Sequence, residues 1–295
     1  MMMHEIPIHG MIQRNETTFG TEEYVSDHQG SSVGRRSPLE RHRRFIIGDI
    51  HGAYDQMLQA LDRSGFDATC DTLYCTGDFC DRGPDTVACI RFLMRIPHIK
   101  PVIGNHDIWL QNWLAVGEAD ALWTWYNGGN ATVASFLTEQ VDENERQEIA
   151  SWLQEIPYAR VEEDCIIVHG GTPDSLTLED IERAANVMRP RYDDLNNPPS
   201  AATLVWDRTY FMSALLYDME NRSMADTSAR TGSIHRTTIP SRPLETDRTI
   251  FIGHTPVPKV FRSASYHLVN VDTGAGKGGV VTILDMDSNA QWNSD

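Results

Sequence analysis

The sequence predicts an α/β fold in which short buried strands alternate with helices. Apolar segments rich in Ile, Val and Phe recur along the chain, and each stops abruptly at a glycine or histidine followed by further polar or small residues. These segments are Phe45–Ile47, Leu73–Cys75, Val102–Ile103, Ile166–Val168 and Ile250–Ile252. Short apolar runs bounded by glycine are typical of buried strands. Helical spacing between the early strands indicates a sheet with helices packed on its faces.

Two helices are predicted between the first three strands. Residues 53–64 carry apolar side chains at helical spacing and are followed by a glycine, a common helix stop. Residues 84–96 open with Pro84, which the first turn of a helix favours, and repeat apolar residues at the same spacing. Each helix would lie between two parallel strands and pack on the sheet.

Residues 1–42 are polar and aperiodic, so we expect a mobile extension that ends in a cluster of arginines. Residues 43–295 are expected to form one domain, since a chain of 295 residues can bury a sizeable core. Within this domain, residues 107–160 contain recurrent tryptophans at helical spacing and predict a helical insert over part of the sheet. Core packing explains such tryptophans better than an aromatic cofactor site.

Two further predictions concern the C-terminal part. Residues 218–247 are polar with little periodicity and predict a long loop or lid. Leu268–Val271 and Val280–Leu284 flank a glycine-rich segment and predict a terminal β-hairpin. The glycine-rich segment, residues 274–279, differs from a phosphate-binding loop, because Gly278 stands where a Ser or Thr would hold Mg²⁺ and a strand follows it.

The chain carries 42 acidic and 25 basic residues, which give a formal net charge of -17. This charge disfavours general affinity for nucleic acid or anionic membranes, so we expect neither as a partner. The five cysteines form no C-x-x-C pair, which is typical of reduced thiols in a cytosolic protein. No apolar run approaches the roughly 18 to 20 residues of a membrane span. We therefore expect a soluble, cytoplasmic protein.

Asp, His and Asn side chains gather in short segments that each follow a predicted strand. In chain order their sequences are GDIHG at residues 48–52, GDFCDRG at 77–83, GNHD at 104–107, HGG at 169–171 and GHTP at 253–256. In α/β sheets, groups that bind ligands collect at the carboxyl ends of the strands. Carboxylate and imidazole ligands suit Mn, Fe and Zn, and a carboxylate can bridge two ions. Two ions about 3.5 to 4 Å apart can clamp both oxygens of a phosphoryl displacement.

These motifs, in this order over residues 44–286, resemble the calcineurin-like metallophosphoesterases. Within them they resemble the phosphoprotein phosphatase family of serine/threonine phosphatases in its bacterial and phage-type form. The resemblance implies a β-sandwich with flanking helices and two divalent metal ions, Mn first, with Fe, Zn, Ni or Co as alternatives. The ligands that it implies are Asp49 and His51 for one ion, Asp78 as a bridge, and Asn105, His169 and His254 for the other.

The same resemblance assigns the reacting groups. It implies that Arg82 grips the phosphate, with Arg208 as a second phosphate-binding arginine, and that His106, oriented by Asp81, protonates the leaving alcohol. A hydroxide bound to the metals would attack phosphorus directly, because two cations lower the pKa of bound water towards about 7. A planar guanidinium suits bidentate contact with phosphate, and an imidazolium held by a carboxylate can supply a proton.

Departures from the wider pattern favour a serine/threonine protein phosphatase. Pro256 stands where nuclease-type members carry a second histidine. Symmetrical dinucleoside tetraphosphate hydrolases usually carry Ala in place of Asp81, so Asp81 favours a phosphoprotein or phosphopeptide substrate. The eukaryotic C-terminal segment is missing, so no regulatory subunit is implied. The alternatives are a hydrolase of dinucleoside polyphosphates or other small phosphate esters, and an inactive metal-binding scaffold.

Overall fold

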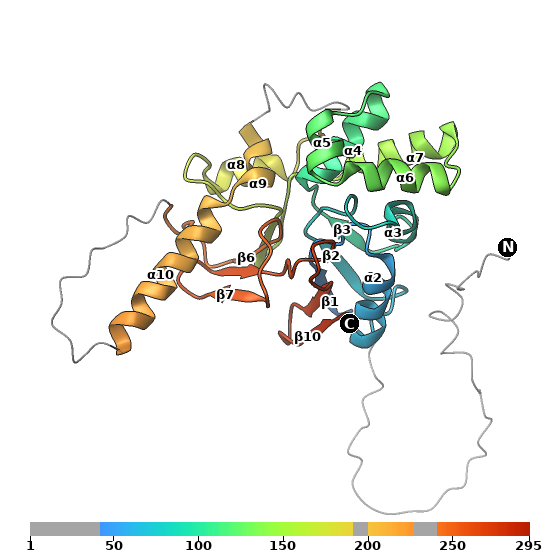
Figure 1. Ribbon diagram of the computed structural model, residues 1–295. Helices are drawn as coiled ribbons and strands as arrows, with labels where there is room; N and C mark the ends of the chain where they lie inside the picture. The colour runs from blue at the N-terminus through green and yellow to red at the C-terminus, as the bar shows by residue number, and fades with distance from the viewer. Residues whose placement is uncertain (1–41, 191–199, 227–240) are drawn as a thin grey trace, which may run out of the picture.

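The computed structural model describes residues 42–190, 200–226 and 241–295, with the backbone alone for 222–226. The extension predicted over residues 1–42 therefore lies outside the described residues except for His42. The described chain folds into two five-stranded sheets with helices around them (Figure 1). This mixed α/β architecture confirms the predicted fold class.

The first sheet combines the N-terminal strands with the end of the chain. In order of pairing its strands are β10 (Gln291–Asn293), β9 (Thr282–Asp285), β1 (Arg44–Ile47), β2 (Thr72–Cys75) and β3 (Ile99–Pro101). Strands β1, β2 and β3 are parallel, whereas β9 runs antiparallel to both of its neighbours. The third strand ends one residue before the predicted segment Val102–Ile103, which leads directly into the polar motif.

The second sheet is built mainly from the C-terminal half. Its strands, in order of pairing, are β4 (Ala159–Val161), β5 (Cys165–Val168), β6 (Thr249–Ile252), β8 (Leu268–Asn270) and β7 (Phe261–Ser263). The three central strands β5, β6 and β8 are parallel. Both sheets thus present the carboxyl ends of parallel strands, where the polar motifs begin.

The two sheets share one apolar layer. Ile46 and Tyr74 of the first sheet belong to the same buried cluster as Ile167, Phe251 and Val269 of the second. Residues next to them in sequence point the other way and join a second cluster that includes the helices. Because both faces of each sheet are covered, the central strands are mostly apolar and lack the polar alternation of a half-exposed sheet.

Helices cover the outer faces of the sandwich. Those nearest the first sheet are α2 (Tyr54–Ser64), α3 (Thr86–Leu93), α4 (Asn105–Val116), α5 (Ala121–Tyr126), α6 (Gly129–Thr138) and α7 (Glu143–Glu155) (Figure 1). Those beside the second sheet are α8 (Leu178–Ala184), η2 (Ser200–Ala202), α9 (Thr203–Trp206) and α10 (Thr209–Asp226). The region predicted as a helical insert holds α4 to α7, and β4 begins at its end. Among the described helices, none has the length and apolar character to cross a bilayer.

The loop predicted over residues 218–247 is wrong for residues 218–226, which are helical. Helix α10 continues through residue 226, and residues 227–240 lie outside the described part of the chain. Tertiary contacts hold this polar stretch in a helix: Asp218 accepts a hydrogen bond of 3.1 Å from Ser263, and the ring of Tyr217 packs against Tyr266. These contacts override the weak amphipathic pattern of the sequence.

The predicted terminal hairpin is wrong. The strand at Leu268–Asn270 pairs with β6 and β7 in the second sheet, whereas Thr282–Asp285 pairs with β1 and β10 in the first. The glycine-rich segment 274–279 therefore crosses from one sheet to the other. An apolar strand pattern reveals burial on both faces but not the identity of the partner strand.

Candidate active site

The polar residues predicted at the strand ends converge at one edge of the sandwich. Each follows a parallel strand by one to four positions, and each side chain is almost fully buried, with at most 7% of the residue exposed. The residues are Asp49 and His51 after β1, Asp78 after β2, Asn105 after β3, His169 after β5 and His254 after β6. The structure thus brings together every residue predicted as a metal ligand.

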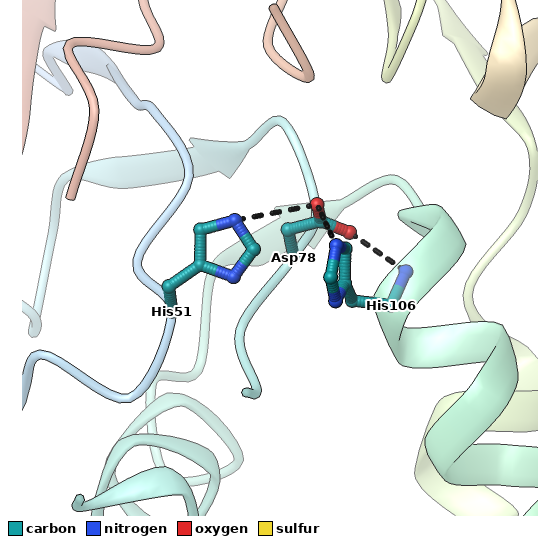
Figure 2. Close-up of side chains that lie close together, drawn as sticks. All are labelled: His51, Asp78 and His106. Atoms are coloured by element: carbon teal, nitrogen blue, oxygen red, sulfur yellow. Dashed lines mark hydrogen bonds and ion pairs between the residues drawn. The ribbon is translucent and has the colours of Figure 1, made fainter. Parts of the chain in front are cut away.

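Asp78 lies at the centre of this group. Its Oδ2 is 3.5 Å from His51 Nε2 and 3.3 Å from His169 Nε2, and Figure 2 shows His51 and His106 on either side of the carboxylate. Its other oxygen, Oδ1, accepts a hydrogen bond of 3.0 Å from the His106 backbone N–H. Burial raises the pKa of Asp78, but the charges of His169 and His106 outweigh it and hold the pKa well below its usual range. Asp78 is therefore an ionised carboxylate between two imidazoles.

Two of the histidines have a fixed tautomer. Nδ1 of His51 lies 2.8 Å from the Cys80 carbonyl, and Nδ1 of His169 lies 2.7 Å from the Thr76 carbonyl. A carbonyl oxygen can only accept, so both Nδ1 atoms carry the proton. Backbone partners of this kind are typical of histidines whose Nε2 binds a metal.

The donor set fits a divalent cation. His169 Nε2 lies 3.1 Å from Asn105 Oδ1 and 3.3 Å from Asp78 Oδ2, so one ring nitrogen and two oxygen atoms converge. Burial lowers the pKa of His169, but the carboxylates of Asp78 and Asp49 raise it overall to about 9. Nε2 of His254 is buried without a hydrogen-bond partner. Burial, followed by the charges of His169 and Arg208, lowers the pKa of His254 to about 2 and keeps it a neutral potential ligand.

Two groups of side chains have ligand atoms close enough to hold an ion. They are His51, Asp78 and His106 on one side and Asp78, His169 and His254 on the other. Asp49 lies beside the first group, because its Oδ2 is 4.0 Å from His51 Nε2. Asp78 belongs to both groups, as a bridging ligand must.

Glycines allow the backbone to approach the two carboxylates. A Cβ atom at Gly104 would lie 2.1 Å from Asp78 Oδ1, and a Cβ atom at Gly253 would lie 2.1 Å from Asp49 Oδ1. Asp49 uses this space to accept hydrogen bonds of 3.0 Å from both the Thr76 hydroxyl and the His254 backbone N–H. The glycines of the motifs thus make room for oxygen atoms that must face inwards.

The backbone is strained at the residues that carry the candidate chemistry. Several non-glycine residues adopt a left-handed conformation, which costs of order 1 to 3 kcal/mol each and clusters at functional sites. Those in the site are His51 at φ 49°, Asp78 at φ 55°, Asp81 at φ 74°, Arg82 at φ 67° and His254 at φ 65°. After β1, β2 and β6 the chain therefore makes a sharp reversal that turns a functional side chain towards the others.

His106 and Asp81 form the predicted pair. His106 Nδ1 lies 2.5 Å from Asp81 Oδ2. Asp81 also accepts hydrogen bonds of 2.7 Å from the Trp123 indole N–H and of 2.7 Å from the Thr132 hydroxyl. Donors from α5 and α6 thus fix the carboxylate that orients His106, whose Nε2 faces the metal ligands.

The two predicted arginines lie at the open side of the site. One Nη of Arg82 lies 2.9 Å from His106 Nε2, and the other contacts His51 Nε2. Arg208 donates to the His254 carbonyl at 3.1 Å and to the Thr255 hydroxyl at 2.9 Å. Neither guanidinium pairs with a carboxylate of the described chain, so both charges remain available for an anion.

The sequence analysis missed three buried partners. Asp272 follows β8 by two positions. Burial of Asp49 raises its pKa well above the usual range, and the negative charge of Asp272 raises it further. The Asp107 carboxylate accepts hydrogen bonds from the backbone N–H groups of Asp78 and Phe79, at 2.7 and 2.8 Å, and braces two loops. Asp272 also follows a parallel strand, but the sequence predicts a hairpin in this region. The hydrogen bond from Trp123 to Asp81 has no local sequence signal.

The two sheets and the buried carboxylates and imidazoles at their strand ends define a candidate metal centre. The calcineurin-like phosphoesterase family matches residues 42–274, most of the chain, and the protein belongs to this family. The resemblance drawn from the motifs is therefore confirmed. A serine/threonine phosphatase structure from Saccharomyces cerevisiae has the same fold, with a TM-score of 0.54 and 16% identity over 87% of this chain and 81% of that one.

Two curated relatives carry the same name. The symmetrical bis(5'-nucleosyl)-tetraphosphatase of Dechloromonas aromatica is 34% identical over 128 residues, 43% of this chain and 43% of that protein. The Klebsiella pneumoniae protein of the same name is 27% identical over 180 residues, 60% of this chain and 56% of that protein. The chain thus spans about half the length of the curated relatives that it matches. These relatives act by name on a small molecule, so the predicted phosphoprotein substrate is wrong.

Proposed function

We propose that the protein is a metal-dependent hydrolase of dinucleoside polyphosphates that cleaves a tetraphosphate chain symmetrically. The observation that carries this proposal is the shared name of the curated relatives, all symmetrical bis(5'-nucleosyl)-tetraphosphatases in the matches described above. Asp81 does not oppose it. Both oxygens of its carboxylate bind side chains of this protein, so Asp81 orients His106 whatever the substrate.

An aromatic wall beside the site supports a substrate that carries nucleobases. The ring of Trp206 packs edge-on against Trp109 and His254, with centroids 5.2 and 6.3 Å away, and Trp109 contacts His106. Trp206 is 39% exposed, so part of its indole remains accessible next to the candidate metal ligands. Stacking of a base on an aromatic ring contributes about 1 to 3 kcal/mol in nucleic-acid complexes.

The residues of the candidate site have two proposed roles. Some would bind the metal ions, and the others would bind or protonate the substrate. Asp49 and His51 would hold one ion, Asp78 both, and Asn105, His169 and His254 the other, with Mn²⁺ as our first choice. When bound, the ions supply Lewis acidity to the phosphoryl oxygens and make water a stronger nucleophile. Carboxylate oxygens and imidazole nitrogens are ligands that such intermediate divalent metals prefer.

Arg82 and Arg208 would hold the reacting phosphoryl group, because a guanidinium fork matches two phosphate oxygens. His106, fixed by Asp81, would place a proton at Nε2 towards the leaving oxygen. In symmetrical cleavage one water molecule is consumed and the leaving group is a nucleoside diphosphate. This anion needs less help from an acid than an alkoxide does.

The test is hydrolysis of diadenosine tetraphosphate with excess Mn²⁺, followed by chromatography of the products. We expect ADP as the sole nucleotide product, with loss of turnover on chelation and in Asp78→Asn. Lys259→Gln, at an exposed residue with no assigned role in the site, is the matched control and should retain full turnover. Release of AMP and ATP, or hydrolysis of p-nitrophenyl phosphate without any cleavage of the dinucleotide, would reject the proposal.

A further inference from the structure

The glycine-rich segment 274–279, here called the glycine turn, forms one wall of the candidate site. A Cβ atom at Gly276 would lie 2.7 Å from His51 Cβ and 3.1 Å from Arg82 Cβ, so the turn lies directly against both residues. The turn is also held in place, because Gly274 N–H donates to Asp272 Oδ1 at 2.9 Å and Lys277 N–H donates to the Gly274 carbonyl at 3.0 Å. Its position relative to the site is therefore fixed by hydrogen bonds.

Lys277 is the one cationic residue of the glycine turn, and its side chain is exposed. Within the described residues its ammonium makes no hydrogen bond or ion pair. Partial desolvation lowers the pKa of Lys277, and the positive charges of Arg82 and Arg208 lower it further, outweighing the carboxylates of Asp272 and Asp49. The lysine is thus close enough to both arginines to be repelled by them.

Arg82, Arg208 and Lys277 form no ion pair with a carboxylate of the described chain, although the net charge of the protein is -17. Elsewhere in the described chain, Arg43, Arg44 and Lys100 each pair with an acidic side chain. Repulsion among neighbouring cations is relieved when a polyanion binds between them. The cluster therefore has more positive charge than one phosphoryl group needs, since two guanidinium forks already match its oxygens.

We propose that Lys277 binds the phosphate adjacent to the scissile phosphoryl group, and so makes the site selective for polyphosphate chains over simple monoesters. A lysine suits this position, because its compact charge can follow a flexible chain without the geometric demands of a guanidinium. The inference rests on the proposed function and assigns it a specificity residue.

The experiment compares Lys277→Gln, Lys277→Arg and the control Lys259→Gln on two substrates, diadenosine tetraphosphate and p-nitrophenyl phosphate. A hydrogen bond to a charged group contributes enough to change affinity about ten- to hundredfold. We expect Lys277→Gln to raise KM for the dinucleotide by that factor with kcat nearly unchanged, and to leave the monoester kinetics as in the wild type. Lys277→Arg should recover most of the loss, and Lys259→Gln should match the wild type.

A second measurement separates this inference from the proposed function. If the wild type does not cleave the dinucleotide, the proposed function fails, and inhibition of p-nitrophenyl phosphate hydrolysis by inorganic tripolyphosphate is measured at constant free Mn²⁺. Lys277→Gln should then weaken inhibition by tripolyphosphate about tenfold or more, and inhibition by inorganic phosphate hardly at all. Equal effects on both inhibitors, or none on either, would overturn the assignment of Lys277.

Discussion

If His106 acts as the proposed acid, the side chains around it determine which leaving groups the enzyme can expel. Nδ1 of His106 is held by Asp81, which is held in turn by Trp123 and Thr132, so the imidazole has one orientation. An acid in this position matters most when the leaving oxygen is strongly basic. The strength of its contribution should therefore depend on the substrate.

We expect His106→Asn to slow hydrolysis of phenyl phosphate far more than hydrolysis of p-nitrophenyl phosphate. Phenol has a pKa of about 10 and needs a proton to leave, so the loss of a general acid should cost about 10² to 10⁴ in kcat. The nitrophenolate and a nucleoside diphosphate are stable anions near neutral pH, so their release should slow less than about tenfold. Steady-state kinetics on phenyl phosphate, p-nitrophenyl phosphate and diadenosine tetraphosphate measure the difference.

Asp81→Asn is the companion variant, because it leaves the imidazole in place and removes the charge that orients it. It should reproduce the same selective loss on phenyl phosphate. If either variant slows all three substrates by the same factor, the residues support the metal ligands and do not act on the leaving group.

Variants of Trp206 test the proposed contact with a nucleobase. Trp206→Ala should raise KM for diadenosine tetraphosphate about five- to hundredfold, since stacking contributes about 1 to 3 kcal/mol. Trp206→Phe keeps an aromatic ring against Trp109 and His254 and should retain most of the affinity. The monoester p-nitrophenyl phosphate has no base and reports whether the site is intact. Parallel losses on both substrates would mean that Trp206 only packs against His254.

At the scale of elements, the site depends on how strands end. Each parallel strand of the site is followed within four positions by an inward-facing polar side chain, and after β1, β2 and β6 the chain reverses through a residue with positive φ. At Gly104 the φ angle is -97°, so the backbone itself would accept any residue. The requirement for glycine there is purely steric, because the missing Cβ leaves room for Asp78 Oδ1.

Gly104→Ala should therefore displace the Asp78 carboxylate and abolish or strongly weaken Mn²⁺ binding, measured by calorimetric titration. We expect a loss of about 1 to 3 kcal/mol in the free energy of unfolding, as for overpacked cores. Gly117→Ala is the matched control. Gly117 ends α4 at φ 77° with no atom near its missing Cβ, so this variant should lose about 1 kcal/mol and bind Mn²⁺ normally. Normal binding in Gly104→Ala would contradict the steric argument.

The same strand ends explain what could be predicted from sequence. Asp49, Asp78 and His169 were found because glycine-bounded apolar strands and the polar residues after them are adjacent in sequence. The bond from Trp123 to Asp81 joins residues 42 positions apart on different elements, and no local pattern encodes it. The crossover at residues 274–279 was mistaken for a hairpin because both flanking strands have the same apolar pattern.

At the scale of the whole molecule, burying ionisable groups in the site makes the stability of the fold depend on pH. Burial and neighbouring carboxylates raise the pKa of Asp49 and Asp272, while two carboxylates hold the pKa of His169 at about 9. All three groups thus favour their protonated forms in the folded chain. A divalent cation can replace those protons, so metal binding, pH and stability must be linked.

The sign of this linkage follows from His169. Its pKa is raised above the ordinary value of about 6.5, so its stabilising contribution is complete below that pH and is lost as the pH rises through about 9. The raised pKa values of Asp49 and Asp272 act in the same direction, because their carboxylates become unfavourable as they ionise. The metal-free protein should therefore lose stability between about pH 6.5 and 9, by an amount on the order of 3 kcal/mol from His169.

Thermal unfolding of the chelated and the Mn²⁺-loaded protein at about pH 6.5 and about pH 8 tests this linkage. We expect the Tm of the chelated protein to fall over this interval, and the gain in Tm from Mn²⁺ to be larger at the higher pH, because fewer protons must be displaced. In His169→Gln the fall in Tm of the chelated protein should be smaller, because the histidine with the raised pKa is gone. A gain from Mn²⁺ that is the same at both pH values, with an unchanged fall in the variant, would show that His169 does not couple proton and metal binding.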